Sequence, residues 1–166
     1  MTGLAVLTLL HTAISIVGIC SGLGVLALMI EGRDNPGWTA VFLTTTVLTS
    51  VTGYFFPFTR LLPSHVVGAV SLVVLAVVLY ARYGRAEQGR WRTVFLVGSV
   101  LALWLNVFVL VAQLFAKVPA LHDLAPTQSE PPFGITQLVV LAVFVVLGLR
   151  AVKRARAAPA SPRPAV

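Results

Sequence analysis

Imidazole, hydroxyl, amide and carboxyl groups occur at only a few places in a chain that is otherwise strongly apolar. His11 and His65 stand in apolar stretches, and His122 stands in a polar segment that also carries Asp123 and Glu130. Neutral imidazole can ligate haem iron, copper or zinc, and it can equally serve as a hydrogen-bond partner between helices. These residue types therefore point either to a ligand or cofactor site or to hydrogen bonds that join helices.

The positions of these groups predict a single pocket. Counting back from Glu31 by about 20 residues, the length of helix that crosses a bilayer, places His11 at the depth of His65. Polar groups within membrane spans are costly unless they meet partners, so we expect them to face one another. The predicted pocket consists of His11, Thr49, His65, Asn106, Gln113, His122 and Glu130. The segment from 122 to 130 would cover it, stiffened by the prolines on either side.

Motifs of catalysis and of metal binding are missing from the sequence. It contains no glycine-rich phosphate loop, no G-x-S-x-G elbow and no H-E-x-x-H pair. Cys20 is the single cysteine, which excludes an intrachain disulfide and a Cys/His zinc pattern. We predict no catalytic residue and no metal ligand set, and the sequence leaves open whether the protein is an enzyme.

The composition is that of a chain surrounded by lipid. Of the 166 residues, 58% are apolar and 10% are charged, whereas a soluble domain carries about 25% charged residues. Five apolar segments approach or exceed the ~17–25 residues that span a bilayer as a helix. These segments are residues 3–30, 38–56, 64–83, 93–115 and 133–149. We therefore predict an all-α integral membrane bundle of five transmembrane helices, with one domain over residues 1–156 and a disordered Ala/Pro/Arg tail over 157–166.

The distribution of basic residues predicts the orientation. Ten of the twelve Lys and Arg residues fall in the first connection, between Arg82 at the end of the third segment and Arg92, or after residue 149. With five helices these three regions share one side, and only Arg60 and Lys117 fall on the other. The excess of positive charge on the cytoplasmic side of membrane proteins places the C-terminus in the cytoplasm and the N-terminus outside. The net charge of +7 is thereby explained by topology, and we expect no nucleic-acid partner.

Small residues at helical spacing predict where the helices approach closely. Gly18 and Gly22 form a G-x-x-x-G pair in the first segment, a motif that lets membrane helices pack backbone to backbone. Thr45, Thr49 and Thr52 form a hydroxyl-bearing stripe in the second segment. We expect these stripes to face the centre of the bundle.

Four short stretches of sequence resemble those of small bacterial multi-pass inner-membrane proteins. They are TGYFFPF at 52–58, PSHVVG at 63–68, LNVFVL at 105–110 and APTQSEPPF at 125–133, spread over the second to fifth segments. The resemblance implies a location in the bacterial cytoplasmic membrane, and it implies no particular activity.

The sequence leaves three functions open. The first is a membrane protein whose outer-facing polar pocket binds a small ligand or a membrane partner, with the lipid bilayer and a homo-oligomer or another membrane protein as partners. The second is a redox accessory that holds haem b or contacts quinone at the outer interface. The third is a transporter or channel subunit, which the lack of charged residues deep in the spans disfavours.

Overall fold

A computed structural model describes residues 2–57 and 63–157, and all regular structure in these ranges is helical. The long helices are α1 (Gly3–Glu31), α2 (Pro36–Thr52), α3 (Pro63–Leu79), α4 (Arg90–Lys117) and α6 (Pro131–Ala157). A 3-10 turn, η1 (Gly53–Phe55), extends α2, and a π-helical turn, η2 (Tyr80–Gly84), extends α3. The short helix α5 (Pro119–His122) lies between α4 and α6.

Four of these helices are long and apolar enough to cross a membrane. They are α1, α3 with η2, α4 and α6. Many of their Leu and Val side chains are exposed, among them Val73 and Leu138, which fits helices surrounded by lipid chains rather than by water. The fold is therefore typical of a multi-pass membrane protein. The predicted second span corresponds to α2, which has 17 residues, so the count of five spans stays a prediction.

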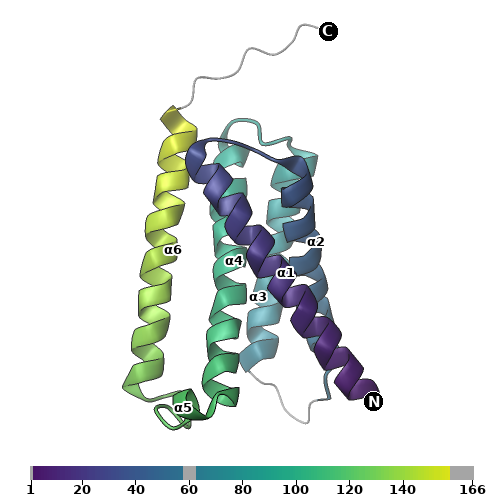
Figure 1. Ribbon diagram of the computed structural model, residues 1–166. Coiled ribbons are helices and arrows are strands. Elements are labelled where there is room, and N and C mark those ends of the chain that lie inside the picture. The colour runs from purple at the N-terminus through teal and green to yellow at the C-terminus, as the bar shows by residue number, and fades with distance from the viewer. Residues whose placement is uncertain (1, 58–62, 158–166) are drawn as a thin grey trace, which may run out of the picture.

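Successive long helices run in opposite directions, and α4 is the helix that contacts all the others (Figure 1). The helix α1 crosses the bundle obliquely and packs on α2, α4 and α6 (Figure 1). The bundle consequently has two ends. We call the end formed by residues 31–35, 82–92 and 150–157 the basic end. We call the end formed by residues 2–15, 49–57, 63–68 and 113–134 the histidine end.

The close approach of α1 to its neighbours depends on glycine, as the G-x-x-x-G pair predicted. A Cβ atom on Gly22 would lie 2.6 Å from Cδ1 of Leu103 and 2.8 Å from the ring of Phe42, both almost wholly buried. A Cβ on Gly18 would lie 3.2 Å from the hydroxyl of Thr45. Interiors of proteins are packed without spare volume, so these two positions fix how near α1 comes to α2 and α4.

Several helix boundaries differ from the predicted ones. The predicted fifth segment ends at residue 149, where the charges begin, but α6 continues to Ala157 because Arg, Lys and Ala are good helix formers outside the lipid as well. The polar segment after the predicted fourth helix contains a short helix, α5, which begins at Pro119, a residue suited to the first position of a helix. The predicted tail, apart from Ala157, lies outside the described residues.

Candidate functional site

The contact between α1 and α2 at the histidine end is made by polar side chains. Nδ1 of His11 lies 2.8 Å from the hydroxyl oxygen of Thr52, and the Ser15 hydroxyl lies 3.4 Å from that of Thr49. Ser15 also donates to the carbonyl of His11 at 2.8 Å. These bonds arise because the helical stripe of residues 45, 49 and 52 faces the stripe of 11, 15 and 18 on α1.

The hydrogen-bond network assigns a tautomer to His11. The Thr52 hydroxyl lies 2.7 Å from the carbonyl of Leu48, a distance at which it donates its single hydrogen to that oxygen. Its oxygen then accepts from His11, so the proton of the neutral imidazole is on Nδ1 and Nε2 carries a lone pair. Within the part of the chain that the structure describes, Nε2 of His11 has no hydrogen-bond partner. The ring thus has one free acceptor.

Both membrane histidines contact the short segment that follows α2. The rings of His11 and Phe56 pack edge to face, with their centroids 5.2 Å apart. The His65 ring lies 5.8 Å from that of Tyr54, and the Tyr54 hydroxyl donates to the backbone carbonyl of His65 at 2.7 Å. His65 is 7% exposed. The short segment after α2, made of η1 and Phe56, therefore places one aromatic ring against each histidine.

Asn106 lies deeper in the bundle than the histidines. Its amide nitrogen donates to the Thr46 hydroxyl at 3.3 Å, and Thr46 is fully buried between the helices. A similar bond, 3.1 Å long, joins Ser50 on α2 to Ser71 on α3. Ser71 was not among the predicted site residues, although it is the one hydroxyl-bearing residue within the apolar run 66–79. These bonds join α2 to α4 and to α3.

The polar segment between α4 and α6 folds onto those two helices (Figure 1). Ala125 is fully buried against Val111 and Phe115, and the amide of Gln128 donates to the carbonyl of Ala112 at 2.8 Å. His122 and Gln113 are exposed. The segment is thus anchored over α4 and α6, whereas the polar contacts of His11 are made with α2.

Glu130 organises the turn that leads into α6. Its carboxylate accepts from the hydroxyl of Thr127 at 2.8 Å and from the backbone amides of Thr127 and Ser129 at 3.2 and 3.1 Å. The bond from the Thr127 hydroxyl is the largest cause that lowers the pKa of Glu130, and the backbone amides add to it. Bonds to the charged form favour that form. Glu130 is therefore committed to local structure.

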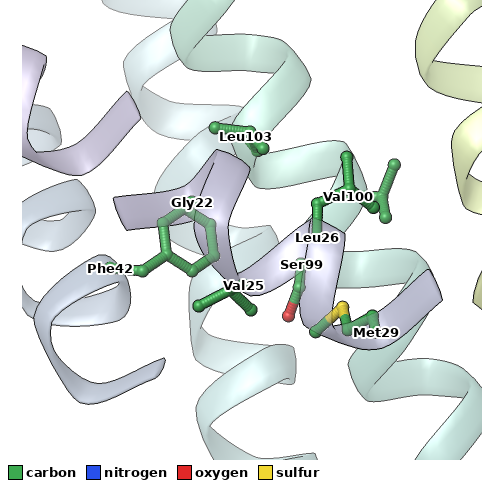
Figure 2. A pocket seen from close by; sticks show the side chains of 8 residues that line it. All are labelled: Gly22, Val25, Leu26, Met29, Phe42, Ser99, Val100 and Leu103. Atoms are coloured by element: carbon green, nitrogen blue, oxygen red, sulfur yellow. The ribbon is translucent and has the colours of Figure 1, made fainter. Parts of the chain in front are cut away.

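Two spaces in the bundle are lined by other residues than those of the predicted pocket. One lies in the core between α1, α2 and α4 and is too narrow to hold water; Figure 2 shows the side chains around it, Gly22, Val25, Leu26, Met29, Phe42, Ser99, Val100 and Leu103. The other, of about 60 Å³, opens at the basic end. In residues 2–57 and 63–157, no three His, Cys, Asp or Glu side chains are grouped as a metal site.

The basic end contains an ion-paired arginine, Arg82, whose pairing is not apparent from the sequence. Arg82 contacts Asp34 at 2.7 Å and also pairs with Glu87, and its guanidinium lies 5.2 Å from the centroid of the Phe95 ring. Ala86 and Glu87 adopt positive φ angles of 45° and 52°, which non-glycine residues rarely do. Strain of this kind is concentrated at functional sites when the surroundings enforce it.

The chain matches no protein-family model, no curated protein and no solved structure.

Proposed function

We propose that the chain is an integral protein of the cytoplasmic membrane, with five transmembrane helices, whose outer end recognises a small ligand or a membrane partner. The N-terminus would lie outside and the C-terminus in the cytoplasm, so that the histidine end faces outward. The binding residues would be those of the α1–α2 polar contact and of the aromatic turn next to it. The segment from His122 to Glu130 would border this surface from the side of α4 and α6.

The observation that carries the proposal is the hydrogen bond between Nδ1 of His11 and the Thr52 hydroxyl, which leaves Nε2 as an acceptor. An acceptor at the end of a membrane bundle is costly to desolvate, and it gains from a partner that brings a hydroxyl or an N–H group. The tautomer is fixed by Thr52, so the acceptor is ready before a ligand arrives. Preorganised groups of this kind bind more tightly because less freedom is lost on binding.

Native mass spectrometry of protein extracted in mild detergent tests the proposal. We expect a non-lipid adduct or a protein partner on the unmodified chain, and we expect the His11→Ala variant to lose it. The matched control is Thr8→Ala on the same helix, because among the described residues the Thr8 hydroxyl bonds only to the carbonyl of Leu4 in its own helix. The same adduct on all three proteins, or an adduct on none of them, would refute binding at His11.

The visible absorption of the same sample tells which kind of ligand is bound. A haem group gives an intense band, and its loss in His11→Ala would identify the redox function. An adduct without visible absorption identifies a small organic ligand or a partner chain.

The orientation is tested separately. A reporter fused after Val166 should be active in the cytoplasm, because the basic residues gather at the end of the bundle where α6 finishes. Activity outside the cytoplasm would reverse the assignment and place the histidine end inside.

A further inference from the structure

The cavity of about 60 Å³ at the basic end has an apolar floor and a charged rim. Met29, Phe95, Leu96 and Ala155 provide the apolar surface, and Gly32, Arg33, Asp34, Glu87 and Arg92 provide the polar one. It lies between the end of α1, the start of α4 and the end of α6. Trp38, Tyr80 and Tyr83, all at least half exposed, stand at the same end, as aromatic residues do at the membrane interface. The cavity is therefore placed to take an amphipathic molecule.

The rim contains equal numbers of positive and negative side chains. Arg33 and Arg92 bring two guanidinium groups, and Asp34 and Glu87 bring two carboxylates. A purely anionic ligand would meet both carboxylates, and a purely cationic one would meet both guanidinium groups. A ligand with one charge of each sign satisfies both pairs.

The charged groups on the rim retain bonding capacity. Arg82 occupies Oδ2 of Asp34 and Oε1 of Glu87, and the other oxygen of each carboxylate has no partner among the described residues. Arg92 likewise has no acidic partner in residues 2–57 and 63–157. The guanidinium group binds phosphate with a planar set of donors, and a carboxylate oxygen accepts from a primary ammonium.

The geometry points to the headgroup of a zwitterionic aminophospholipid as the ligand of this cavity. We propose that its phosphate lies against Arg92 and Arg33, that its primary ammonium lies against Asp34 and Glu87, and that its acyl chains run along the apolar side. A quaternary ammonium has no N–H to donate to the carboxylates. A headgroup with a phosphate but no cation brings no ammonium group to the free oxygens of the two carboxylates, whose other oxygens are paired with Arg82.

The strained backbone next to the cavity fits this assignment. Glu87 is held at positive φ by its bond to Arg82 and by the backbone bond from its own amide to the carbonyl of Ala81, 2.9 Å long. Glu87 is thus fixed in place before a ligand arrives. The π-helical turn η2, which carries Arg82, is itself an irregularity that is frequent at functional sites.

The test measures thermal unfolding of the delipidated full chain in detergent, titrated with three lipids of identical acyl chains. The headgroups are phosphoethanolamine, phosphocholine and phosphoglycerol. Free phosphoethanolamine without acyl chains is a fourth titrant. We expect the unfolding midpoint to rise most with the phosphoethanolamine lipid, because a ligand that binds the folded state stabilises it.

Two variants test the role of the rim. Arg92→Gln should weaken the apparent affinity for the phosphoethanolamine lipid about tenfold, the size expected for one charge-assisted bond. Arg156→Gln, which removes an exposed charge of the same end outside the cavity, should leave it unchanged. If Arg92→Gln does not fold, the comparison of headgroups on the unmodified protein decides alone.

Four outcomes would overturn the proposal. Equal stabilisation by the three lipids would mean that the cavity does not distinguish their headgroups. A larger effect of the phosphoglycerol lipid, or equal losses in both variants, would mean attraction to anionic surfaces only. An equal effect of free phosphoethanolamine would mean a soluble ligand instead of a lipid.

Discussion

The two ends of the bundle are held together by different interactions. At the basic end, Arg82 joins the connection after α1 to the connection before α4 through two carboxylates. At the histidine end, the described contacts between α1 and α2 are bonds among neutral imidazole and hydroxyl groups. Ion pairs are screened by salt, whereas bonds between neutral groups are not, so the two ends should respond differently to ionic strength.

The difference follows from where each end sits along the chain. Connections rich in Arg, Asp and Glu supply the basic end, and these residues lie outside the apolar segments or, like Arg82, at the very end of one, where water and headgroups solvate them. The histidine end draws its polar groups from within helices, where only uncharged side chains are tolerated at modest cost. One end is thus suited to charged partners, and the other to partners that offer a hydrogen-bond donor.

We expect the largest effect from a substitution that lies between the two ends and disturbs the packing of both. Gly22→Ala places a methyl group against Leu103 and Phe42, and we expect a loss of about 1–3 kcal/mol in the free energy of unfolding. Gly134→Ala is the matched control, since nothing lies within 4 Å of a Cβ there. Thermal unfolding in detergent measures both. Equal stability of the two variants would show that α1 does not approach α2 and α4 as described.

Loss of Arg82 should weaken only the basic end. Arg82→Gln leaves Asp34 and Glu87 without their cation and releases the strained Glu87, and we expect a cost of about 2 kcal/mol. Arg33→Gln breaks the exposed pair with Glu31 and should cost less than about 1 kcal/mol. Chemical denaturation with urea, which adds no salt, gives both values. An Arg82 effect no larger than that of Arg33 would remove the reason for treating this end as a built site.

The histidine end is tested by a double-mutant cycle on His11 and Thr52. We expect a coupling energy of about 1 kcal/mol between His11→Ala and Thr52→Ala, because one neutral hydrogen bond joins the two side chains. The coupling should be the same at low and at high salt. Strong dependence on salt would show that the two ends do not differ in the way described.

The smallest effect concerns the turn before α6. The pKa of Glu130 is lowered in the folded protein, so its contribution to stability is present above its ordinary pKa of 4.5 and is lost as the pH falls through the lower, folded value. Glu130→Gln should therefore reduce the fall in stability below about pH 4.5. Unfolding midpoints measured between neutral and acidic pH for both proteins give the comparison. Parallel pH profiles would assign the acid sensitivity to other carboxylates.

Much of the bundle follows from local patterns in the chain. Runs of apolar residues locate the long helices, and prolines and glycines mark their ends, because backbone groups in lipid must be bonded within a helix. Gly18 and Gly22 could be identified as contact positions because only small residues permit such an approach. The predicted ends of α2 and α6 differ from the observed ones, because hydropathy alone does not reveal a 3-10 turn or a helix that continues into water.

The candidate site was predictable only in part. The sequence suggested that His11 and His65 share one end, and the structure adds that both contact the residues around η1. The sequence did not indicate that the 122–130 segment packs on α4 and α6, because the burial of Ala125 depends on contacts with distant residues.

The sequence by itself determined that the chain forms apolar helices and where its charges fall, because helix formation in lipid and the hydration of charges depend on local composition. Only the tertiary structure decided which polar groups meet. The pairing of His11 with Thr52 and of Arg82 with Asp34 joins residues more than 40 positions apart. Such pairs depend on the angle and register at which the helices pack, and these are set by close contacts such as that of Gly22 with Phe42.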